Sequence, residues 1–372
     1  MIYADNAATS SMCQEAKDAM LKGMELFGNP SSTHAAGRAA RKAIEEARRI
    51  IADCIGGDPE GIYFTSGGTE SDNIVTAQPY KIITSDIEHA ALYKNPNVHP
   101  VIPADREGIV SRNAVYAAAF TQPIIISVMA VNNEVGTIQP IGEITKMLRT
   151  TNPNIVFHTD AVQALGHIPI NAKEMKFDML SGSAHKFRGP KGIGILYCDP
   201  LYNQPPMQLM YGGDQERKVR PGTENVPAIM AMAAALRQQC ETMGKRKLAV
   251  TTMRDELAYR LLKISDSHIN GSMVNRVAGN LNIRFDGVDA ETLVALLDSK
   301  GICVSAGAAC HSGSVEPSHV LKNMGLTDAQ AKSAIRISLN EENTMDEIAI
   351  IAKGIANAVD TLRTQSIKPA FI

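Results

Sequence analysis

A lysine stands at the end of a short apolar segment near the middle of the chain. Residues 178–180 have the composition of a buried strand, residues 181–183 (Ser-Gly-Ser) favour a turn, and Lys186 follows. An ammonium group is costly to bury, so a lysine here is either solvated or neutralised through a covalent bond to its amine. In the second case the amine would bind an aldehyde cofactor as a Schiff base. The segment alone favours an ordinary surface lysine.

An aspartate ends a second segment of the same kind. Residues 155–160 are mostly apolar and β-branched, and residues 161–165 after Asp160 favour a helix. In open parallel sheets ligands bind at the carboxyl ends of strands, so Asp160 and Lys186 are predicted to face one ligand. The pair suits pyridoxal phosphate, whose ring nitrogen needs an anionic partner. A helix-capping role is the alternative for Asp160.

A glycine-rich turn supplies a candidate phosphate site. A strand-like run at residues 62–65 leads into Ser66-Gly-Gly-Thr-Glu-Ser71, which opens a predicted helix through residues 73–75. Free N–H groups and the positive end of the helix dipole attract an anion, although a capped turn is the simpler explanation. The sequence contains no P-loop or H-E-x-x-H motif, and Gly192-Ile-Gly194 runs into a strand rather than a helix. We therefore expect neither a dinucleotide fold nor a metal site.

Alternating strand and helix signals predict the elements that must position these residues. Strand-like runs recur at Tyr63, Ile82, 124–128, 155–158, Met179 and 193–198, and helical patterns cover 15–27, 35–55 and 227–243. This alternation predicts an α/β fold with a mainly parallel sheet covered on both faces. We place a boundary at the basic residues 245–247. Residues 12–245 are then a large α/β domain, and residues 1–11 and 246–372 form a smaller α+β domain.

Composition indicates an intracellular enzyme. The chain has 372 residues, 44% of them hydrophobic, and a net charge of −2, so neither nucleic acid nor an anionic membrane is an expected partner. There is no 18-residue apolar run, and because the first residues resemble a strand we expect no signal peptide. Six cysteines without a C-x-x-C motif argue for a reducing compartment, and we expect the cytoplasm.

Many motifs in one order carry a family resemblance. The chain resembles the cysteine desulfurases of the NifS/IscS type, in the class V aminotransferase group of fold-type I pyridoxal-phosphate enzymes. The resemblance runs from residue 3 to about residue 363. Besides the segments around Asp160 and Lys186, it rests on Tyr3-Ala-Asp-Asn-Ala-Ala-Thr9, Phe27-Gly-Asn-Pro-Ser-Ser-Thr-His34, Thr65-Ser-Gly-Gly-Thr-Glu-Ser-Asp-Asn73, Glu88-His89, Val131-Asn-Asn-Glu-Val-Gly136, Arg220-Pro-Gly-Thr223, Ser305-Ala-Gly-Ala-Ala-Cys310 and Ala334-Ile-Arg336-Ile-Ser338.

The resemblance implies a role for each residue around the cofactor ring. Lys186 would bind pyridoxal phosphate covalently and carry protons between the substrate carbons. Asp160 would pair with the ring nitrogen and Gln163 with the ring hydroxyl. His89 would stack on the ring and act as an acid–base group, and Asn133 would lie close to the ring. From the sequence alone, His89 would sooner be an ordinary hydrogen-bonded histidine.

Further residues would hold the phosphate and the substrate. Gly68, Thr69, Ser183 and His185 would surround the phosphate, joined by Thr223 from a second subunit. In the same way, Arg336 would grip the substrate carboxylate as a bidentate fork, with Asn29 assisting.

Cys310 distinguishes between the reactions open to this family. It lies among small residues, 305–314, which favour an exposed loop. There its thiolate would take sulfur from L-cysteine as a persulfide and release L-alanine. The other five cysteines are expected to pack as small hydrophobic residues. The alternatives are a selenocysteine lyase, an aminotransferase of the same fold, or a non-catalytic sulfur-trafficking protein.

The resemblance also implies partners. We expect a homodimer and a sulfur-acceptor protein, either an iron–sulfur scaffold or a relay for thio-cofactor or tRNA thiolation. Residues 76–81 and 93–105 are shorter than the corresponding family segments, so we expect one or two trimmed surface helices.

Overall fold

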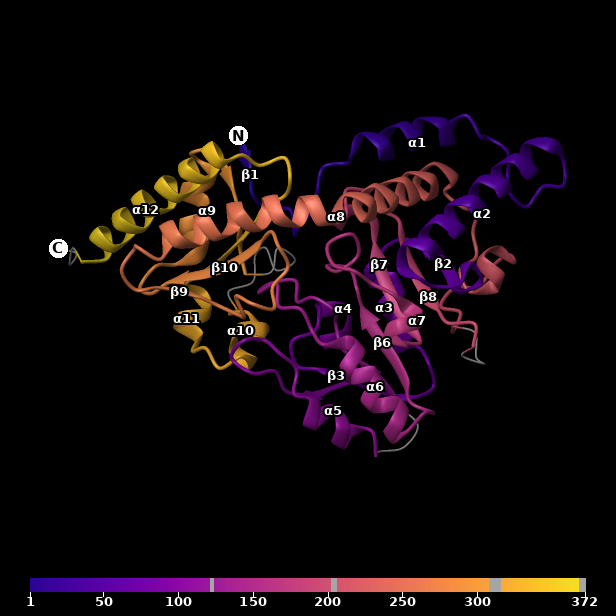
Figure 1. Cartoon of the computed structure of the whole chain (residues 1–372), viewed down its shortest axis with the longest axis horizontal. Coiled ribbons are helices and arrows are strands. Elements are labelled where there is room, and N and C mark those ends of the chain that lie inside the picture. Colours follow the sequence, from indigo (N-terminus) through magenta and orange to yellow (C-terminus); the bar gives the residue numbers. More distant parts are fainter. Residues whose placement is uncertain (121–123, 202–205, 308–315, 368–372) are drawn as a thin grey trace.

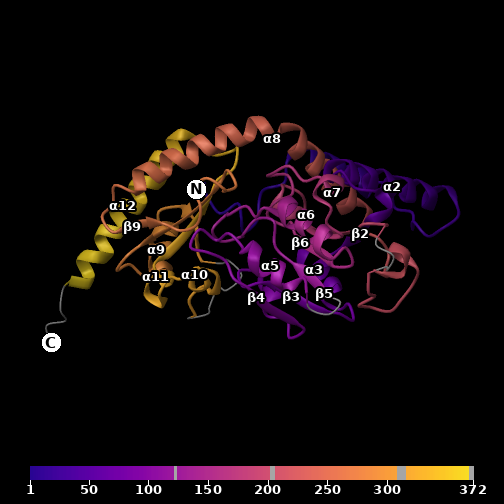
Figure 2. The ribbon, with the colours of Figure 1, turned by 60° about the horizontal axis from the view of Figure 1, so that its bottom comes forward.

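Two bodies of secondary structure lie side by side, joined along one long helix. The structure is a computed structural model that describes residues 1–120, 124–201, 206–307 and 316–367. Figure 1 shows the larger body on the right and the smaller on the left, with α8 (Val226–Leu261) running across both. In the turned view of Figure 2, α8 passes over the top of the two bodies. None of the described helices has both the length and the apolar composition needed to span a membrane.

The larger body is built on a seven-stranded sheet. Only β8 runs antiparallel to its neighbours; the remaining strand pairs are parallel. In spatial order the strands are β2 (Ile62–Thr65), β8 (Gly194–Cys198), β7 (Met179–Ser183), β6 (Val156–Asp160), β5 (Ile124–Ser127), β3 (Lys81–Ser85) and β4 (Val98–Ile102). All of these except β8 therefore end at the same edge of the sheet, as expected for an α/β ligand-binding fold.

Helices cover both faces of this sheet. On β6, Val156 packs into one apolar cluster and the next residue, Phe157, into another, because successive strand residues point to opposite faces. The covering helices are α1 (Gln14–Met24), α2 (Ala35–Ile55), α3 (Gly68–Thr76), α4 (Ala90–Tyr93), α5 (Arg112–Ala118), α6 (Ile141–Thr151), α7 (Ala172–Met175) and part of α8.

The smaller body contains an antiparallel sheet and receives the start of the chain. Its strands are, in spatial order, β12 (Ser305–Ala306), β13 (Ala334–Ser338), β10 (Asn280–Phe285) and β9 (Ser267–Ile269). β1 (Ile2–Tyr3) pairs in parallel with β11 (Ile302–Cys303), so the first residues join the smaller body. Its helices are α9 (Ala290–Asp298), α10 (His319–Asn323), α11 (Asp328–Lys332) and α12 (Met345–Ile367).

Three local expectations from the sequence are wrong. Residues 161–165 form turns rather than a helix, and residues 181–183 continue strand β7 rather than making a turn. The helix expected to end at residue 243 continues to Leu261 as α8. The boundary predicted at residue 245 thus falls inside a helix that both bodies share. We retain the division into two domains as a proposal, with α8 as the shared element.

Candidate active site

The shared edge of the large sheet brings most of the predicted residues together. Gly68 follows β2, His89 follows β3, Asp160 ends β6 and Ser183 ends β7. Because these strands end at the same edge, residues from four separate parts of the sequence converge there.

Lys186 lies inside the fold rather than on an open surface. It ends a short 3-10 helix, Ala184–Lys186, directly after β7, and is half-buried. Its Nζ donates hydrogen bonds to the backbone carbonyls of Ala7 and Ala8, both at 2.7 Å. Gln163 Nε2 donates to the Ala7 carbonyl at 2.9 Å. The N-terminal segment therefore holds the lysine and the glutamine from one side.

Asp160 is a buried carboxyl at the end of β6. Its side chain is only 4% exposed, and Oδ1 accepts a hydrogen bond from the Val162 amide at 2.8 Å. Burial raises the pKa of Asp160, while His89, the Val162 amide and Lys186 act in the opposite direction. His89 and Lys186 therefore lie close enough to Asp160 to influence its charge, and a buried carboxylate is the partner that a protonated ring nitrogen requires.

His89 sits where strand β3 gives way to helix α4. It is the N-cap of that helix, and its Nδ1 accepts a hydrogen bond from the Ala91 amide at 3.2 Å. An Nδ1 that accepts a hydrogen bond carries no proton, which leaves the proton of a neutral ring on Nε2. The capping bond thus fixes both the tautomer and the orientation of the ring.

The glycine turn forms a close-packed cradle at the start of α3. A Cβ on Gly68 would lie 2.5 Å from Val162 Cγ2, too close for a side chain, and 3.8 Å from Ser183 Cβ, an ordinary contact distance. Thr69 is exposed at this helix end, and His185 Nδ1 lies 3.2 Å from Thr9 Oγ1. Burial, together with Lys186 and Lys191, lowers the pKa of His185 to about 4. At neutral pH this histidine is an uncharged hydrogen-bonding group.

Arg336 is buried and already engaged within the chain. Its Nη1 donates to the Asn133 carbonyl at 2.9 Å and its Nη2 to Asp5 Oδ1 at 3.0 Å. Two buried polar atoms near this contact, Arg336 Nε and Asn133 Oδ1, have no hydrogen-bond partner among the described residues. A bidentate grip on a carboxylate therefore requires Asp5 to release the guanidinium, which sequence reasoning did not anticipate.

Two more carboxyls are buried close to Asp160. Burial and the charge of Asp160 raise the pKa of Asp72 well above its usual value, and burial raises that of Glu88 to about 8. His158 lies between Ser127 and Ser181, with its Nε2 3.8 Å from Asp72 Oδ1, and burial lowers its pKa to about 3. Among these three carboxyls, Asp160 is the one whose pKa is lowered by the neighbouring His89, Lys186 and Val162 amide, against the effect of burial.

Three predicted residues stand apart from this convergence. Asn29 is exposed in the connection between α1 and α2 of the larger body, whereas Arg336 lies on β13 of the smaller body. Thr223 is exposed and lines a cavity of about 230 Å³ together with Ser66 and Arg220 of the same chain. Cys310 lies outside the described residues.

The structure adds residues that the sequence did not single out. The backbone carbonyls of Ala7 and Ala8 accept hydrogen bonds from Lys186. Because these contacts use backbone atoms, the side chains at positions 7 and 8 do not predict them. Asp5 pairs with Arg336, and Glu134 is buried beside them. Asp5 and Glu134 both lie within motifs on which the family resemblance rests. Their acidic side chains in those motifs were the feature from which a role at the site could have been predicted.

Comparison with known proteins gives consistent matches over the whole chain. A family model described as aminotransferase class-V matches residues 2–351. Cysteine desulfurase IscS from Methanosarcina thermophila is 42% identical over 381 residues, covering 98% of this chain and 93% of that protein. A NifS-like protein from Rickettsia africae matches with a TM-score of 0.90 and 32% identity, covering 97% and 99% of the two chains. The structure of SspA in complex with cysteine matches with a TM-score of 0.78 and 31% identity, over 91% and 99%.

Proposed function

Because the chain belongs to the class-V aminotransferase family, we propose that it acts as a cysteine desulfurase, which removes sulfur from L-cysteine and releases L-alanine. The observation that carries this proposal is that Asp160 at the end of β6, His89 after β3 and Lys186 after β7 lie at the same edge of the large sheet. The similarity to enzymes named cysteine desulfurase over almost the full chain supports it.

The residues present fit pyridoxal phosphate. Gly68 keeps the backbone at the N-terminus of α3 free of a side chain, because a Cβ would meet Val162 Cγ2 at 2.5 Å, and Asn133 Oδ1 and Arg336 Nε are buried polar atoms without a partner among the described residues. Asp160 would accept the ring N–H, and Gln163 would contact the ring hydroxyl. Gly68, Thr69, Ser183 and His185 would hold the phosphate. When bound, the cofactor supplies the electron-withdrawing ring that weakens the bonds at the substrate's Cα.

The chain's own groups would then orient the substrate and move protons. Arg336 would exchange Asp5 for the substrate carboxylate, and the Lys186 amine would carry protons between Cα and Cβ of the substrate. His89, whose neutral ring carries its proton on Nε2, would act as the second acid–base group. Cys310 would attack the substrate sulfur: the S–S bond of a persulfide forms, the C–S bond breaks, and Cβ receives a proton to give alanine.

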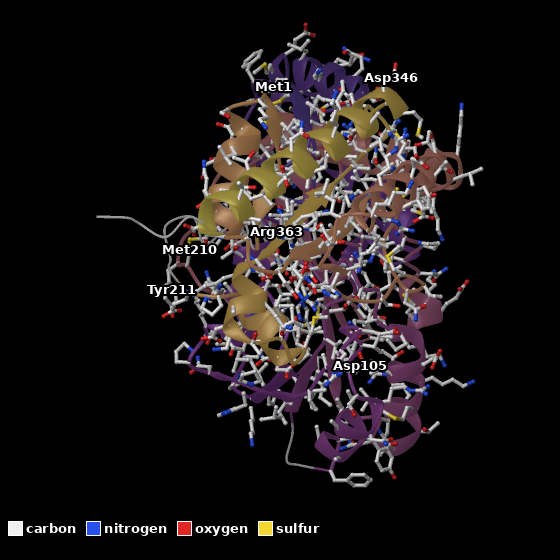
Figure 3. All side chains as sticks on the ribbon, turned by 90° about the vertical axis from the view of Figure 1, so that its left-hand side faces the viewer. Met1, Asp105, Met210, Tyr211, Asp346 and Arg363 are labelled. Atoms are coloured by element: carbon white, nitrogen blue, oxygen red, sulfur yellow. The ribbon has the colours of Figure 1, made fainter. Side chains whose placement is uncertain are left out.

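The proposal includes a second copy of the chain and a sulfur acceptor. Several large apolar side chains are exposed, among them Phe27 at 89% and Tyr211 at 93%. Figure 3 shows Tyr211 and Met210 together at one edge of the molecule. Such exposed apolar groups favour a protein interface, and we propose a homodimer in which Thr223 and Asn29 reach the partner's site. An acceptor thiol would take the outer sulfur from Cys310 for an iron–sulfur scaffold or a thiolation relay.

Two substitutions test the proposed chemistry. Cys310→Ala should abolish alanine formation from cysteine and keep the visible absorbance of the bound cofactor. Lys186→Ala should lose both, because the amine that binds the cofactor is gone. Alanine release and absorbance are measured on the same preparations. Full turnover by Cys310→Ala would contradict the persulfide route, and an unchanged absorbance in Lys186→Ala would contradict the role of the lysine.

A further inference from the structure

Lys186 lies in a turn whose own backbone leaves carbonyls without partners. The turn, residues 184–189, begins with the 3-10 helix Ala184–Lys186, and its first carbonyl accepts two amides from later in the turn. The last carbonyls of a helix have no partner inside that helix. In a helix this short they are the carbonyls of His185 and of Lys186 itself, so their partners must come from other parts of the chain. We call residues 184–189 the lysine turn.

Ser10 provides the hydrogen-bond partner before Lys186. Its amide and its Oγ both donate to the His185 carbonyl, at 2.9 and 2.8 Å. The same Oγ accepts the Arg188 amide at 2.9 Å. Arg188 has a φ angle of 66°, an unfavourable conformation for a residue with a side chain, so the turn depends on contacts from outside to keep its shape. Ser10 therefore spans the lysine turn from the residue before Lys186 to the second residue after it.

His167 provides the partner for the carbonyl of Lys186. Its Nε2 lies 3.0 Å from that carbonyl oxygen; a carbonyl can only accept, so Nε2 carries the proton and donates. Burial lowers the pKa of His167, Arg246 adds to this effect, and the bond to the carbonyl and the charge of Glu341 oppose it. The ring is therefore uncharged at neutral pH, and its N–H is engaged by the backbone of the lysine.

Hydrogen bonds connect three segments of the chain around this lysine. Residues 7–10 accept its amine at two carbonyls and hold its turn from one side. His167 lies in the turns that follow Asp160, and Gln163 of the same turns donates to the Ala7 carbonyl at 2.9 Å. Each of the three segments is therefore bonded to the other two. This arrangement fixes the backbone of the lysine relative to Asp160.

We propose that Ser10 and His167 are positioning residues for Lys186, which direct its amine to the place where it bonds to the aldehyde of the cofactor. This inference rests on the proposed function, in which that amine binds pyridoxal phosphate. The uncharged amine adds to the aldehyde carbon, a carbon–nitrogen double bond forms, and the aldehyde oxygen leaves as water with the two amine protons.

The proposed role predicts which step each residue affects. The hydrogen bonds of Ser10 and His167 reach the backbone of the lysine turn rather than the reacting nitrogen or the predicted phosphate site. Loss of either residue should therefore slow formation of the covalent bond and leave the non-covalent hold on the cofactor intact. A displacement of about 1 Å in such an arrangement costs roughly 100-fold in rate.

The test separates these two steps on the full chain freed of cofactor. Pyridoxine 5'-phosphate has the ring and the phosphate but no aldehyde, so calorimetric titration with it measures the non-covalent site. Rapid mixing with pyridoxal 5'-phosphate, followed by absorbance, measures the covalent step. His167→Phe and Ser10→Ala should bind pyridoxine phosphate within about twofold of the wild type and form the covalent bond roughly 10- to 100-fold more slowly.

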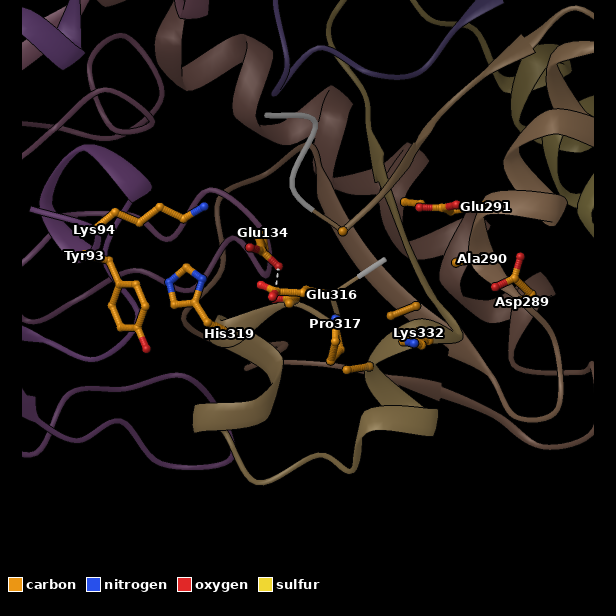
Figure 4. A pocket seen from close by; sticks show the side chains of 15 residues that line it. Tyr93, Lys94, Glu134, Asp289, Ala290, Glu291, Glu316, Pro317, His319 and Lys332 are labelled. Atoms are coloured by element: carbon orange, nitrogen blue, oxygen red, sulfur yellow. Dashed lines mark hydrogen bonds between the residues drawn. The ribbon is translucent and has the colours of Figure 1, made fainter. Parts of the chain in front are cut away.

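Conservative variants and a matched control accompany them. His167→Gln keeps a side-chain N–H and Ser10→Thr keeps the hydroxyl, so both should recover most of the rate. The control is His319, whose Nε2 also lies 3.0 Å from a carbonyl oxygen, that of Glu88. Figure 4 shows its ring facing Tyr93 at the wall of a cavity of about 230 Å³, and the two rings are stacked with centroids 4.0 Å apart. His319→Phe should form the covalent bond at the wild-type rate.

Each result decides for or against the role. Wild-type rates of bond formation in both His167→Phe and Ser10→Ala, or an equal slowing in His319→Phe, would overturn it. A loss of affinity for pyridoxine phosphate as large as the loss of rate would overturn it too, because the whole site would then be loosened. A wild-type chain that binds no pyridoxal phosphate, or that releases no alanine from cysteine once loaded, would instead reject the proposed function. Because each residue has its own pair of variants, one pair suffices if the other does not fold.

Discussion

Glu88 is a buried acid whose proton links the stability of the fold to pH. Its Oε1 accepts hydrogen bonds from Ser85 Oγ at 2.5 Å and from the Met129 amide at 2.9 Å, and Oε2 has no partner among the described residues. Burial raises its pKa to about 8 from an ordinary value of 4.5. Between these values the folded protein holds a proton that the unfolded chain has lost, so the stability contributed by this proton falls as pH rises.

Replacing Glu88 by Gln should remove that pH dependence. Glutamine keeps the oxygen that accepts both hydrogen bonds and cannot ionise. From about pH 5 to about pH 8, the free energy of unfolding of the wild type should fall more steeply than that of Glu88→Gln, by about 1.4 kcal/mol per pH unit. Urea unfolding at several pH values measures both slopes, with the exposed Glu291→Gln as control. Parallel slopes for the wild type and Glu88→Gln would mean that Glu88 is ionised throughout.

Two glycines allow a matched test of the cradle at α3. A Cβ on Gly68 would lie 2.5 Å from Val162 Cγ2, whereas a Cβ on Gly244 within α8 would meet nothing within 4 Å. Gly68→Ala should lower the free energy of unfolding by about 1–3 kcal/mol and weaken phosphate-dependent cofactor binding. Gly244→Ala should raise that free energy by about 0.5–1 kcal/mol, since alanine favours a helix. Equal stabilities of the two variants in thermal or urea unfolding would contradict the close approach at Gly68.

At the scale of elements, a left-handed turn is held in place by a buried ion pair. Glu216, Arg217 and Lys218 have φ angles of 45°, 53° and 71°, an unfavourable conformation for side-chain-bearing residues. The Glu216 carboxylate binds both Nη atoms of Arg48 on α2, at 2.8 and 3.0 Å, and accepts the Phe64 amide at 2.8 Å. These bonds compensate the strained turn and attach it to β2, which leads into the glycine cradle.

Adjacent arginines of α2 provide the test of this ion pair. The Arg48 side chain is 5% exposed, whereas the Arg49 side chain, paired with Glu46, is 62% exposed. Arg48→Met leaves the Glu216 charge buried without its partner and should cost about 3–5 kcal/mol of unfolding free energy. Arg49→Met should change it by less than about 0.5 kcal/mol. Similar losses for both variants in chemical denaturation would rule out a special contribution from the buried pair.

The sequence predicts local elements well where one rule dominates. Helix α2 matches the expected residues 35–55: the His34 side chain accepts the Gly37 amide at its start, and Gly56 with φ of 61° ends it. The turn predicted at residues 181–183 (Ser-Gly-Ser) is wrong because these residues pair with β8 as part of strand β7, although their composition favours a turn. Gly182 pairs with Ile195 of β8, and a Cβ there would lie 2.5 Å from Leu165 and 3.0 Å from Ile195. Gly182 is therefore needed for close packing within a strand. Composition alone does not distinguish such a glycine from one in a turn.

The site is predictable in its residue types and less so in its contacts. Asp160, His89 and Lys186 converge because strand order follows general rules for α/β sheets. The engagement of Arg336 by Asp5 depends on where the first residues of the chain return, and the hydrogen bond from Ser318 to Glu134 depends on how the two bodies meet. Both are long-range contacts, and no local pattern encodes them.

At the scale of the whole molecule, exposed apolar side chains predict self-association. Phe27 and Tyr211 expose most of their apolar surface to solvent. Burial of these side chains against a second copy of the chain would remove that surface from water. Replacing both by serine should shift the protein from dimer toward monomer in analytical ultracentrifugation. Leu248→Ser, at a leucine of α8 that is 73% exposed, is the control and should leave the mass unchanged. A wild-type protein that sediments as a monomer would reject the dimer.

The pairing of β1 with β11 has a consequence for chimeric proteins. Ile2 and Tyr3 pair with Ile302 and Cys303. The smaller body therefore contains residues that come before the larger body in the sequence as well as residues that come after it. A single crossover between this chain and a relative would give a small sheet built from two different parents. Exchange of the smaller body between relatives therefore needs two crossover points, one after the first strand and one within α8. In genetic terms the larger body behaves as an insertion, and recombination that respects this boundary should yield folded hybrids.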